Sequence, residues 1–258
     1  MRRSYKGINI NTSRNTHETV FQLMARDPNQ IVLDIPTGNG AFVQRLKDHG
    51  FSTIYAMDIV NRLEIDHDDF VAGDMMQPLS LPDASCDTVV CIDGLEHIHR
   101  QYDFVQEANR LLKMGGHFIV STPNVSSLRS RWKWLWTGHH HKCPAPLDER
   151  RPSPHHHIGM ISFPELRYML HTNGFTIQAV TTNRIKLVSW LFGLLLPLVY
   201  LATVLAYRKE AKREGTADIN QDILQTVFSR DILFGETLIV QARKTNPILP
   251  TSNNEFSK

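Results

Sequence analysis

The sequence is poor in cysteine and carries almost no net charge, and both features exclude common classes of protein. Its three cysteines, at positions 86, 91 and 143 of 258 residues, show no CxxC spacing, so neither a disulfide framework nor a zinc ribbon is indicated. The 28 basic and 26 acidic residues leave a formal net charge of +2, too little to favour nucleic acid through bulk electrostatics. We expect a protein of a reducing, cytosolic environment that does not bind nucleic acid.

The N-terminus also lacks the long apolar run of a secretory signal. Its first ten residues, MRRSYKGINI, are partly basic, and the chain continues polar through Thr19, so we expect the main domain to stay inside the cell. In the whole chain, by contrast, 41% of the residues are hydrophobic. That share is enough for one sizeable core, and one domain is the expected organisation.

Short apolar runs alternate with stretches of helical periodicity in the first half of the chain. The run IVLDI at 31–35 is followed by the turn PTGNG and by a helical pattern at 41–50. Further apolar runs at 52–58, 87–93 and 116–122 predict strands, and a helix is predicted at 102–113. Nearly continuously apolar strands that alternate with helices predict a parallel sheet covered on both faces, which is a doubly wound α/β fold.

Acidic residues or glycines follow several of these strands. Ligands of such sheets bind beyond the carboxyl ends of the strands. Asp58 ends one strand, where it could accept hydrogen bonds from two ribose hydroxyls, and Gly38 and Gly40 would let the backbone approach a ligand closely. By itself this pattern also fits a dinucleotide, and a glycine turn can serve packing alone.

Four segments between Val32 and Pro123 follow one another in the chain: LDIPTGNG, AMDIV, AGDMMQPLSLPDASCDTVV and EANRLLKMGGHFIVSTPN. In order and spacing they together resemble the class I S-adenosylmethionine-dependent methyltransferase family, especially the group that includes the ubiquinone-pathway O-methyltransferases. LDIPTGNG resembles the family's D/E-x-G-x-G-x-G loop, and AMDIV its acidic ribose-binding motif. AGDMMQPLSLPDASCDTVV resembles its G-D and L-P-x-x-x-x-F-D segment, and EANRLLKMGGHFIVSTPN the helix and strand that follow. The resemblance implies S-adenosylmethionine as cofactor and a Rossmann-like sheet of seven strands, mostly parallel, with an antiparallel final strand.

The resemblance also implies which residues hold the cofactor. Asp34 and the two glycines would border its methionine end, Asp58 with Ile59 would hold ribose and adenine, and Asp74 with Met75 would contact the adenine ring. Pro36 replaces the family's first glycine and has no amide to offer. The full implied set is Asp34, Pro36, Gly38, Gly40, Asp58, Ile59, Asp74, Met75 and Asp93.

The acceptor side of the site is less well defined. CIDGLEHIHR follows the fourth strand and resembles an L-E-H segment of the family, so His97 is the predicted general base for a hydroxyl acceptor. A histidine that only hydrogen-bonds the next helix is the alternative. Histidines at 139–141 and 155–157 flank Cys143, but adjacent histidines in a loop rarely point at one ion, and no metal is expected. Residues 124–160 are expected to form a mobile flap, or else a solvated loop.

A long uncharged run lies between two segments that we expect to be strands of one sheet. Residues 187–207, LVSWLFGLLLPLVYLATVLAY, match a hydrocarbon core of ~30 Å as a helix, although a buried helix in a dimer interface is an alternative. Because the strands expected at 175–181 and 236–242 share a sheet, a single crossing is disfavoured, and Pro197 would kink the helix into a monotopic anchor. Basic residues at 208, 209, 212 and 213 suit anionic headgroups, or form an ordinary solvated face.

A second candidate for a membrane contact is SLRSRWKWLW at 127–136. Leu128, Trp132, Leu135 and Trp136 share one helical face there. Alternating basic and aromatic residues can also bind single-stranded nucleic acid. The neighbouring apolar run makes lipid the better partner.

These features divide the chain into four parts. We expect a core at 1–184 with its flap at 124–160, a membrane-associating insertion at 185–232, the final strand at 233–244 and a disordered tail at 245–258. The predicted function is methyl transfer to oxygen of a lipid-soluble or lipid-linked acceptor, by a peripheral or monotopic protein on the cytoplasmic face of a membrane. A membrane-bound scaffold that keeps the fold without catalysis, and a soluble dimer acting on a small metabolite, are the alternatives. The sequence does not indicate the oligomeric state.

Overall fold

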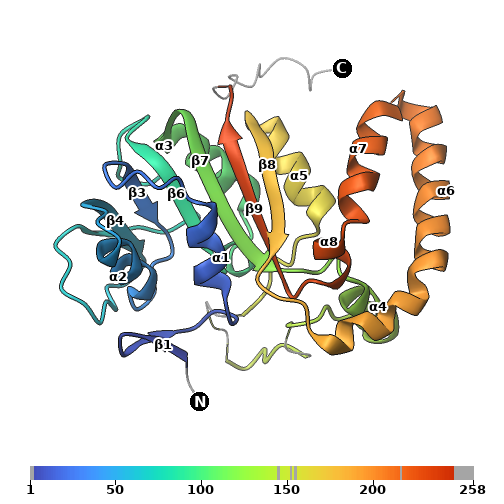
Figure 1. Cartoon of the computed structure of the whole chain (residues 1–258), viewed down its shortest axis with the longest axis horizontal. Coiled ribbons are helices and arrows are strands. Elements are labelled where there is room, and N and C mark those ends of the chain that lie inside the picture. The colour runs from blue at the N-terminus through green and yellow to red at the C-terminus, as the bar shows by residue number, and fades with distance from the viewer. Residues whose placement is uncertain (1–2, 144–145, 152, 154–155, 216, 247–258) are drawn as a thin grey trace.

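A seven-stranded sheet forms the centre of the molecule (Figure 1). The computed structural model describes residues 3–143, 146–151, 153, 156–215 and 217–246. The strand order is β5-β4-β3-β6-β7-β9-β8, and β9 alone runs antiparallel to its neighbours. The predicted doubly wound sheet with an antiparallel final strand is therefore confirmed. Its strands are β3 Ile31–Asp34, β4 Thr53–Asp58, β5 Phe70–Ala72, β6 Cys86–Ile92, β7 Leu112–Pro123, β8 Phe175–Thr182 and β9 Thr237–Lys244.

Helices cover both faces of the sheet, which is why its strands are almost continuously apolar. Helices α1 Thr16–Leu23 and α2 Ala41–Asp48 pack on one face through Val20, Phe42 and Leu46. Helices α3 Gln101–Leu111 and α5 Phe163–Thr172 pack on the other face. The strand order reverses between β3 and β6, where ligands bind in doubly wound folds.

Several elements were not predicted, among them the three-residue strand β5, a hairpin and a 3-10 turn. A hairpin of β1 Arg3–Tyr5 and β2 Ile8–Ile10 lies beside α2, where the Tyr5 hydroxyl and the Lys6 ammonium both contact the Asp48 carboxylate. A 3-10 turn, η1 Leu95–His97, follows β6. Segments of three residues are too short to show a hydrophobic period, so the sequence pattern could not indicate them.

The apolar run continues as helix but differs in detail from the prediction. It forms the 3-10 helix η2 Leu187–Leu195 and then α6 Leu196–Glu214. Pro197 lies in the first turn of α6, where a missing amide costs no hydrogen bond, so it begins this helix instead of kinking it. Helices α7 Ala217–Val227 and α8 Arg230–Phe234 lead back to β9. Residues 233 and 234, which we had placed in the final strand, thus belong to α8.

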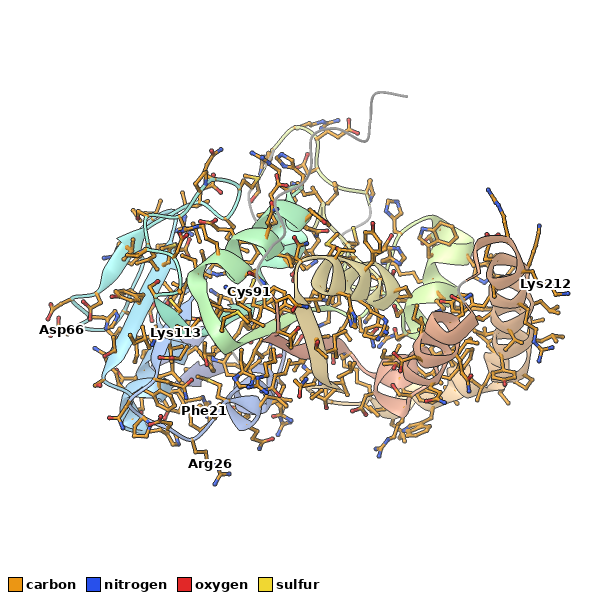
Figure 2. The ribbon with its side chains drawn as sticks, turned by 90° about the horizontal axis from the view of Figure 1, so that it is seen from above. Phe21, Arg26, Asp66, Cys91, Lys113 and Lys212 are labelled. Atoms are coloured by element: carbon orange, nitrogen blue, oxygen red, sulfur yellow. The ribbon has the colours of Figure 1, made fainter. Side chains whose placement is uncertain are left out.

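Helix α6 stands at the outer side of the molecule, with α7 between it and the sheet (Figure 1). Figure 2 shows Lys212 of α6 at one extreme of the molecule, Asp66 at the other and Cys91 of β6 in the middle. Helix α4 Leu128–Thr137 packs against η2. Of the predicted tail, the amides of Thr245 and Asn246 bond to the Gly174 carbonyl oxygen, and residues 247–258 lie outside the described part of the chain.

Candidate cofactor and acceptor site

A cavity of about 840 Å³ lies beyond the carboxyl ends of the central strands. Nearly every residue that the sequence analysis assigned to the site lines this cavity. Gly40 is the exception, because it caps α2 instead. The predicted residues that the structure brings together here are Asp34, Pro36, Gly38, Asp58, Ile59, Asp74, Met75, Asp93 and His97.

The turn after β3 and the end of β4 are joined by one carboxylate. The Gly38 amide donates to Oδ2 of Asp58 at 2.9 Å, and the Ile59 amide donates to Oδ1 at 2.8 Å. Gly38 and Gly40 have φ values of +56° and +85°, a region that favours glycine. A Cβ atom on Gly40 would also lie 2.8 Å from a methyl of Leu63. The glycine turn is thus required both by its backbone conformation and by close packing.

Asp34 ends β3 and is 1% exposed. Burial raises its pKa to about 7, with the negative charge of Asp58 adding to the shift and the Thr37 hydrogen bond opposing it. The Thr37 hydroxyl donates to Oδ2 of Asp34 at 2.9 Å. Such a carboxyl can pair with a cationic group of a ligand once it ionises.

The ring of Pro36 is accommodated by Gly94, which lies in the connection between β6 and η1. A Cβ atom on Gly94 would lie 2.4 Å from Cδ of Pro36, so the proline ring fills space that any other residue at position 94 would need. The Ile35–Pro36 peptide bond is cis. The next amide, that of Thr37, still donates to the Met57 carbonyl oxygen at 2.9 Å. The proline therefore leaves the contacts of the following turn intact.

Large apolar side chains lie beside Asp58 on the solvent side. Ile59 is 58% and Val60 53% exposed, although both line the cavity. Asp74 Oδ1 accepts a hydrogen bond from the Met76 amide at 2.9 Å, and the neighbouring Met75 is buried. An apolar rim next to carboxylates suits a flat ring that carries a ribose.

Asp93 lies across the cavity with a left-handed backbone, φ +47°. The Ser121 hydroxyl donates to its Oδ1 at 2.7 Å. Burial raises the pKa of Asp93, while hydrogen bonds from Ser121 and from the backbone of Ser13 oppose that shift. Its contacts thus join β7 and the N-terminal segment to the site.

His97 lies next to two groups that the sequence analysis did not single out. Glu96 is 1% exposed, and burial together with the charge of Asp93 raises its pKa well above the usual value. The ring of His157 lies 4.9 Å from that of His97, centroid to centroid, and Nδ1 of His97 is 3.3 Å from the His156 carbonyl oxygen. Glu96 stands in the L-E-H segment itself, so its position beside His97 was the signal that could have found it.

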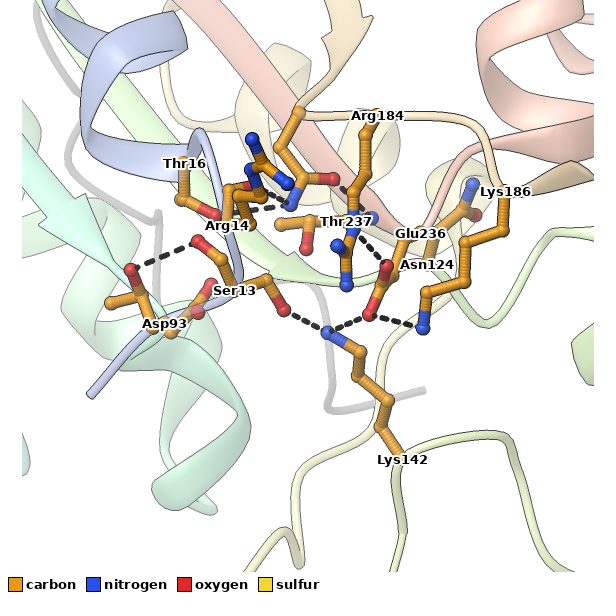
Figure 3. Close-up of polar contacts among 12 residues, drawn as sticks. Ser13, Arg14, Thr16, Asp93, Asn124, Lys142, Arg184, Lys186, Glu236 and Thr237 are labelled. Atoms are coloured by element: carbon orange, nitrogen blue, oxygen red, sulfur yellow. Dashed lines mark hydrogen bonds and ion pairs between the residues drawn. The ribbon is translucent and has the colours of Figure 1, made fainter. Parts of the chain in front are cut away.

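One buried carboxylate at the rim ties three segments together (Figure 3). Glu236, just before β9, contacts Arg184 at 2.5 Å, Lys142 at 3.0 Å and Lys186 at 3.1 Å. Lys142 also donates to the Ser13 hydroxyl. Burial raises the pKa of Glu236, but hydrogen bonds and charges from these cations outweigh burial and lower it to about 2. No local motif marks this cluster, because its members are far apart in the sequence.

Comparison with known proteins assigns the family. A methyltransferase domain family matches residues 11–180. The chain belongs to this methyltransferase family. The family and the relatives described next imply S-adenosylmethionine as its cofactor. The cavity holds residues that fit it: Asp58 would accept bonds from ribose hydroxyls, Ile59 and Met75 would contact adenine, and Asp34 would face the methionine end. When bound, the cofactor supplies an activated methyl group.

Two curated relatives carry the same cofactor in their names. The chain is 36% identical over 119 residues to a protein of Mycolicibacterium smegmatis named as a probable S-adenosylmethionine-dependent methyltransferase, covering 42% of this chain and 44% of that protein. A similarly named protein of Mycobacterium tuberculosis is 50% identical over 46 residues, covering 18% of this chain and 17% of the relative. The chain thus spans less than half the length of these relatives.

Solved structures share the fold at low identity. An S-adenosylmethionine-dependent methyltransferase of Mesorhizobium loti has a TM-score of 0.51 and 15% identity, covering 88% of this chain and 96% of that chain. The [4+2]-cyclase SpnF has a TM-score of 0.51 and 17% identity, covering 90% and 81%. Because a cyclase shares the fold, the reaction must be argued from the site.

Proposed function

We propose that the protein transfers the methyl group of S-adenosylmethionine to oxygen of a lipid-soluble or lipid-linked acceptor, while it sits on the cytoplasmic face of a membrane. The grouping with ubiquinone-pathway O-methyltransferases stays a prediction of the sequence. The observation that carries the proposal is a large exposed apolar surface that follows the same edge of the sheet as the cavity. We call this surface, formed by residues 187–205 of η2 and α6, the apolar arm.

Many apolar side chains of the apolar arm are exposed, which is unfavourable in water. Leu187 and Leu194 are 88% and 89% exposed, and Leu198, Leu201 and Leu205 share one exposed face of α6. By length and composition, the helical segment Leu187–Arg213, which contains an 18-residue window with a mean hydropathy of 2.1, could cross a membrane. Exposed apolar patches of this size mark contacts with lipid or with a partner.

Helix α4 adds aromatic surface beside the arm. Its first residue, Leu128, is buried against Phe234 and the base of the arm. Trp132, Trp134, Leu135 and Trp136 near its end are exposed. Tryptophan is enriched at the level of lipid headgroups. The Lys133 side chain does not point toward the lipid headgroups, because its ammonium donates to the carbonyl oxygens of His140 and Cys143.

The arm and α4 lie at the edge of the sheet that carries the cavity. Strand β7 ends at Pro123 shortly before α4, and β8, which runs in the same direction, ends at Thr182 shortly before η2. Both apolar elements therefore leave the carboxyl edge of the sheet, where Figure 1 shows them close together. A lipid acceptor bound there would be near the cofactor.

The topology supports a monotopic contact. Strands β8 and β9, on the two sides of the arm, pair with each other over most of their length. Helix α7 returns alongside α6, with the side-chain amide Nδ2 of Asn220 donating to the Tyr207 carbonyl oxygen at 3.1 Å. A chain that leaves and re-enters one sheet cannot place its ends on opposite faces of a membrane.

Labelled methyl transfer tests the proposal. The full-length protein is incubated with S-adenosylmethionine carrying a labelled methyl group and with total membrane lipid, and the organic phase is analysed by mass spectrometry. We expect label in a lipid fraction as an O-methyl group. Label on nitrogen or carbon, or only in water-soluble metabolites, would contradict the proposal, and cofactor binding without any transfer would favour the scaffold.

A further inference from the structure

Three potential metal ligands meet at the wall of the cavity. One ligand atom each from Glu96, His97 and His157 lies within 4.8 Å of the others. In a tetrahedral zinc site, metal bonds of about 2.0–2.2 Å place the ligand atoms about 3.3–3.6 Å apart. The three side chains would therefore have to draw together by up to about 1.5 Å to bind one ion.

A second observation points to a ligand at this place. Glu96 is 1% exposed, and its Oε2 atom has no hydrogen-bond partner within the described part of the chain. An unsatisfied buried carboxylate oxygen is costly unless something binds it. The negative charge of Asp93 acts on the same carboxylate. The nearest cation that acts on His157 is Lys142, whose charge is opposed by Glu236 at 3.0 Å.

The histidines are held by backbone contacts outside the cluster. The His156 carbonyl oxygen, 3.3 Å from Nδ1 of His97, can only accept, so this contact places a proton on Nδ1. Histidine ligands in metal sites are oriented in this way. The Gly159 amide donates to the Glu96 carbonyl oxygen at 2.9 Å, and Gln101 bonds the Gly159 carbonyl oxygen. The segment of His157 is thus tied, through Gly159 two residues later, to the turn that carries the other two ligands.

We propose that Glu96, His97 and His157 bind a divalent transition metal ion, with zinc as the best match to two imidazoles and one carboxylate. Three protein ligands leave a position open toward the cavity. If the proposed methyl transfer holds, an acceptor oxygen would bind there, and its hydroxyl pKa would fall. In this role, Glu96, His97 and His157 hold the ion, and the ion positions and activates the acceptor.

Zinc titration of the full-length, untagged protein after treatment with a chelator tests this inference without any assay of activity. Calorimetry should show one Zn²⁺ per chain. His157→Gln and Glu96→Gln should each weaken binding by more than about tenfold, while His139→Gln, in the other histidine run, should bind like the wild type. When Co²⁺ replaces Zn²⁺, the absorption spectrum should show the bands of imidazole-bound cobalt. The variant His157→Gln should weaken these bands.

Circular dichroism and thermal unfolding of each variant confirm that it is folded. No stoichiometric zinc binding by the wild type would overturn the inference, as would equal binding by the folded Glu96→Gln and His157→Gln variants. Loss of binding in His139→Gln would assign the ion to the 139–141 run instead and also overturn it. Titration with S-adenosylmethionine is independent of these outcomes, so a failure of the proposed function is recognised separately.

Discussion

The Lys142 ammonium lies 3.0 Å from Oε1 of Glu236, and this contact joins the segment after α4 to the start of β9. Arg184 and Lys186 share the same carboxylate. One acidic side chain therefore holds together the end of β8, the start of β9 and the predicted flap at the rim of the cavity.

The acid stability of the protein should depend on Glu236. Its pKa in the folded state is about 2, below the ordinary value of 4.5, so its ionised form stabilises the fold above pH 4.5. This contribution is lost as the pH falls from about 5 toward 2. Glu236→Gln should lower stability at pH 7 by about 1–3 kcal/mol and show a weaker loss between pH 5 and 3. Urea unfolding at several pH values measures this; parallel pH curves for both proteins would contradict it.

Gly159 should tolerate no side chain. A Cβ atom there would lie 2.3 Å from the Ile98 carbonyl oxygen and 2.5 Å from Nε2 of Gln101. We expect Gly159→Ala to cost about 1–3 kcal/mol of stability and to move His157 away from Glu96. Gly193→Ala is the matched control, because a Cβ atom there meets Phe234 at an ordinary 3.6 Å. Thermal unfolding compares them, and equal midpoints would show that the approach at Gly159 is not close.

Binding to vesicles should depend on the apolar arm. The double variant Leu194→Glu and Leu198→Glu places two charges on its exposed surface and should reduce partition into vesicles by at least about tenfold. Met114→Glu is the control, since Met114 is also 60% exposed but lies near the start of β7, away from the arm. Sedimentation with phosphatidylcholine vesicles containing phosphatidylglycerol measures the effect. Unchanged partition would contradict the membrane contact of the arm, and a dimer that the double variant dissociates would assign the arm to a protein interface.

Cofactor affinity should rise with pH around neutrality. The pKa of Asp34 is about 7 in the free protein, and an ionised Asp34 is the form that attracts the ammonium group at the methionine end. The affinity for S-adenosylmethionine should therefore increase from pH 6 to pH 8, by up to about tenfold. Asp34→Asn should bind more weakly and lose most of this dependence. A wild-type affinity that is flat over this range would contradict the role of Asp34.

The sequence predicted the sheet and the cofactor side of the cavity well, because both depend on local patterns. Apolar runs give strands, and the residue that ends each strand lies at one edge of a parallel sheet. Asp34 and Asp58 could thus be placed together from their positions alone. The family match and the sheet confirm the fold and the cofactor, and Asp34 and Asp58 line one cavity; their contacts with the cofactor stay a prediction.

The ion-pair cluster of Glu236 and the acceptor side of the cavity depend on contacts between residues far apart in the sequence, and no local pattern predicts such contacts. Glu236 contacts Lys142 and Arg184 only after β9 has inserted between β7 and β8. His157 reaches Glu96 through the close approach at Gly159. The two histidine runs predict no metal site, because neighbouring histidines rarely bind one ion. In the proposed site, one histidine of a run, His157, is joined by Glu96 and His97 of η1. The sequence pattern predicts a kink at Pro197, because the apolar run gives no sign of where the α-helix begins.

Calorimetric titration with S-adenosylmethionine tests the central claim most directly. The variant is Asp58→Ala, and the control is Asp66→Ala, which changes an exposed acidic residue that does not line the cavity. We predict micromolar binding by the wild type and by Asp66→Ala, and loss of binding in Asp58→Ala, whose carboxylate is placed to hold the ribose. Absence of binding by the folded wild-type protein, or equal binding by Asp58→Ala, would contradict the assignment of this cavity as the cofactor site.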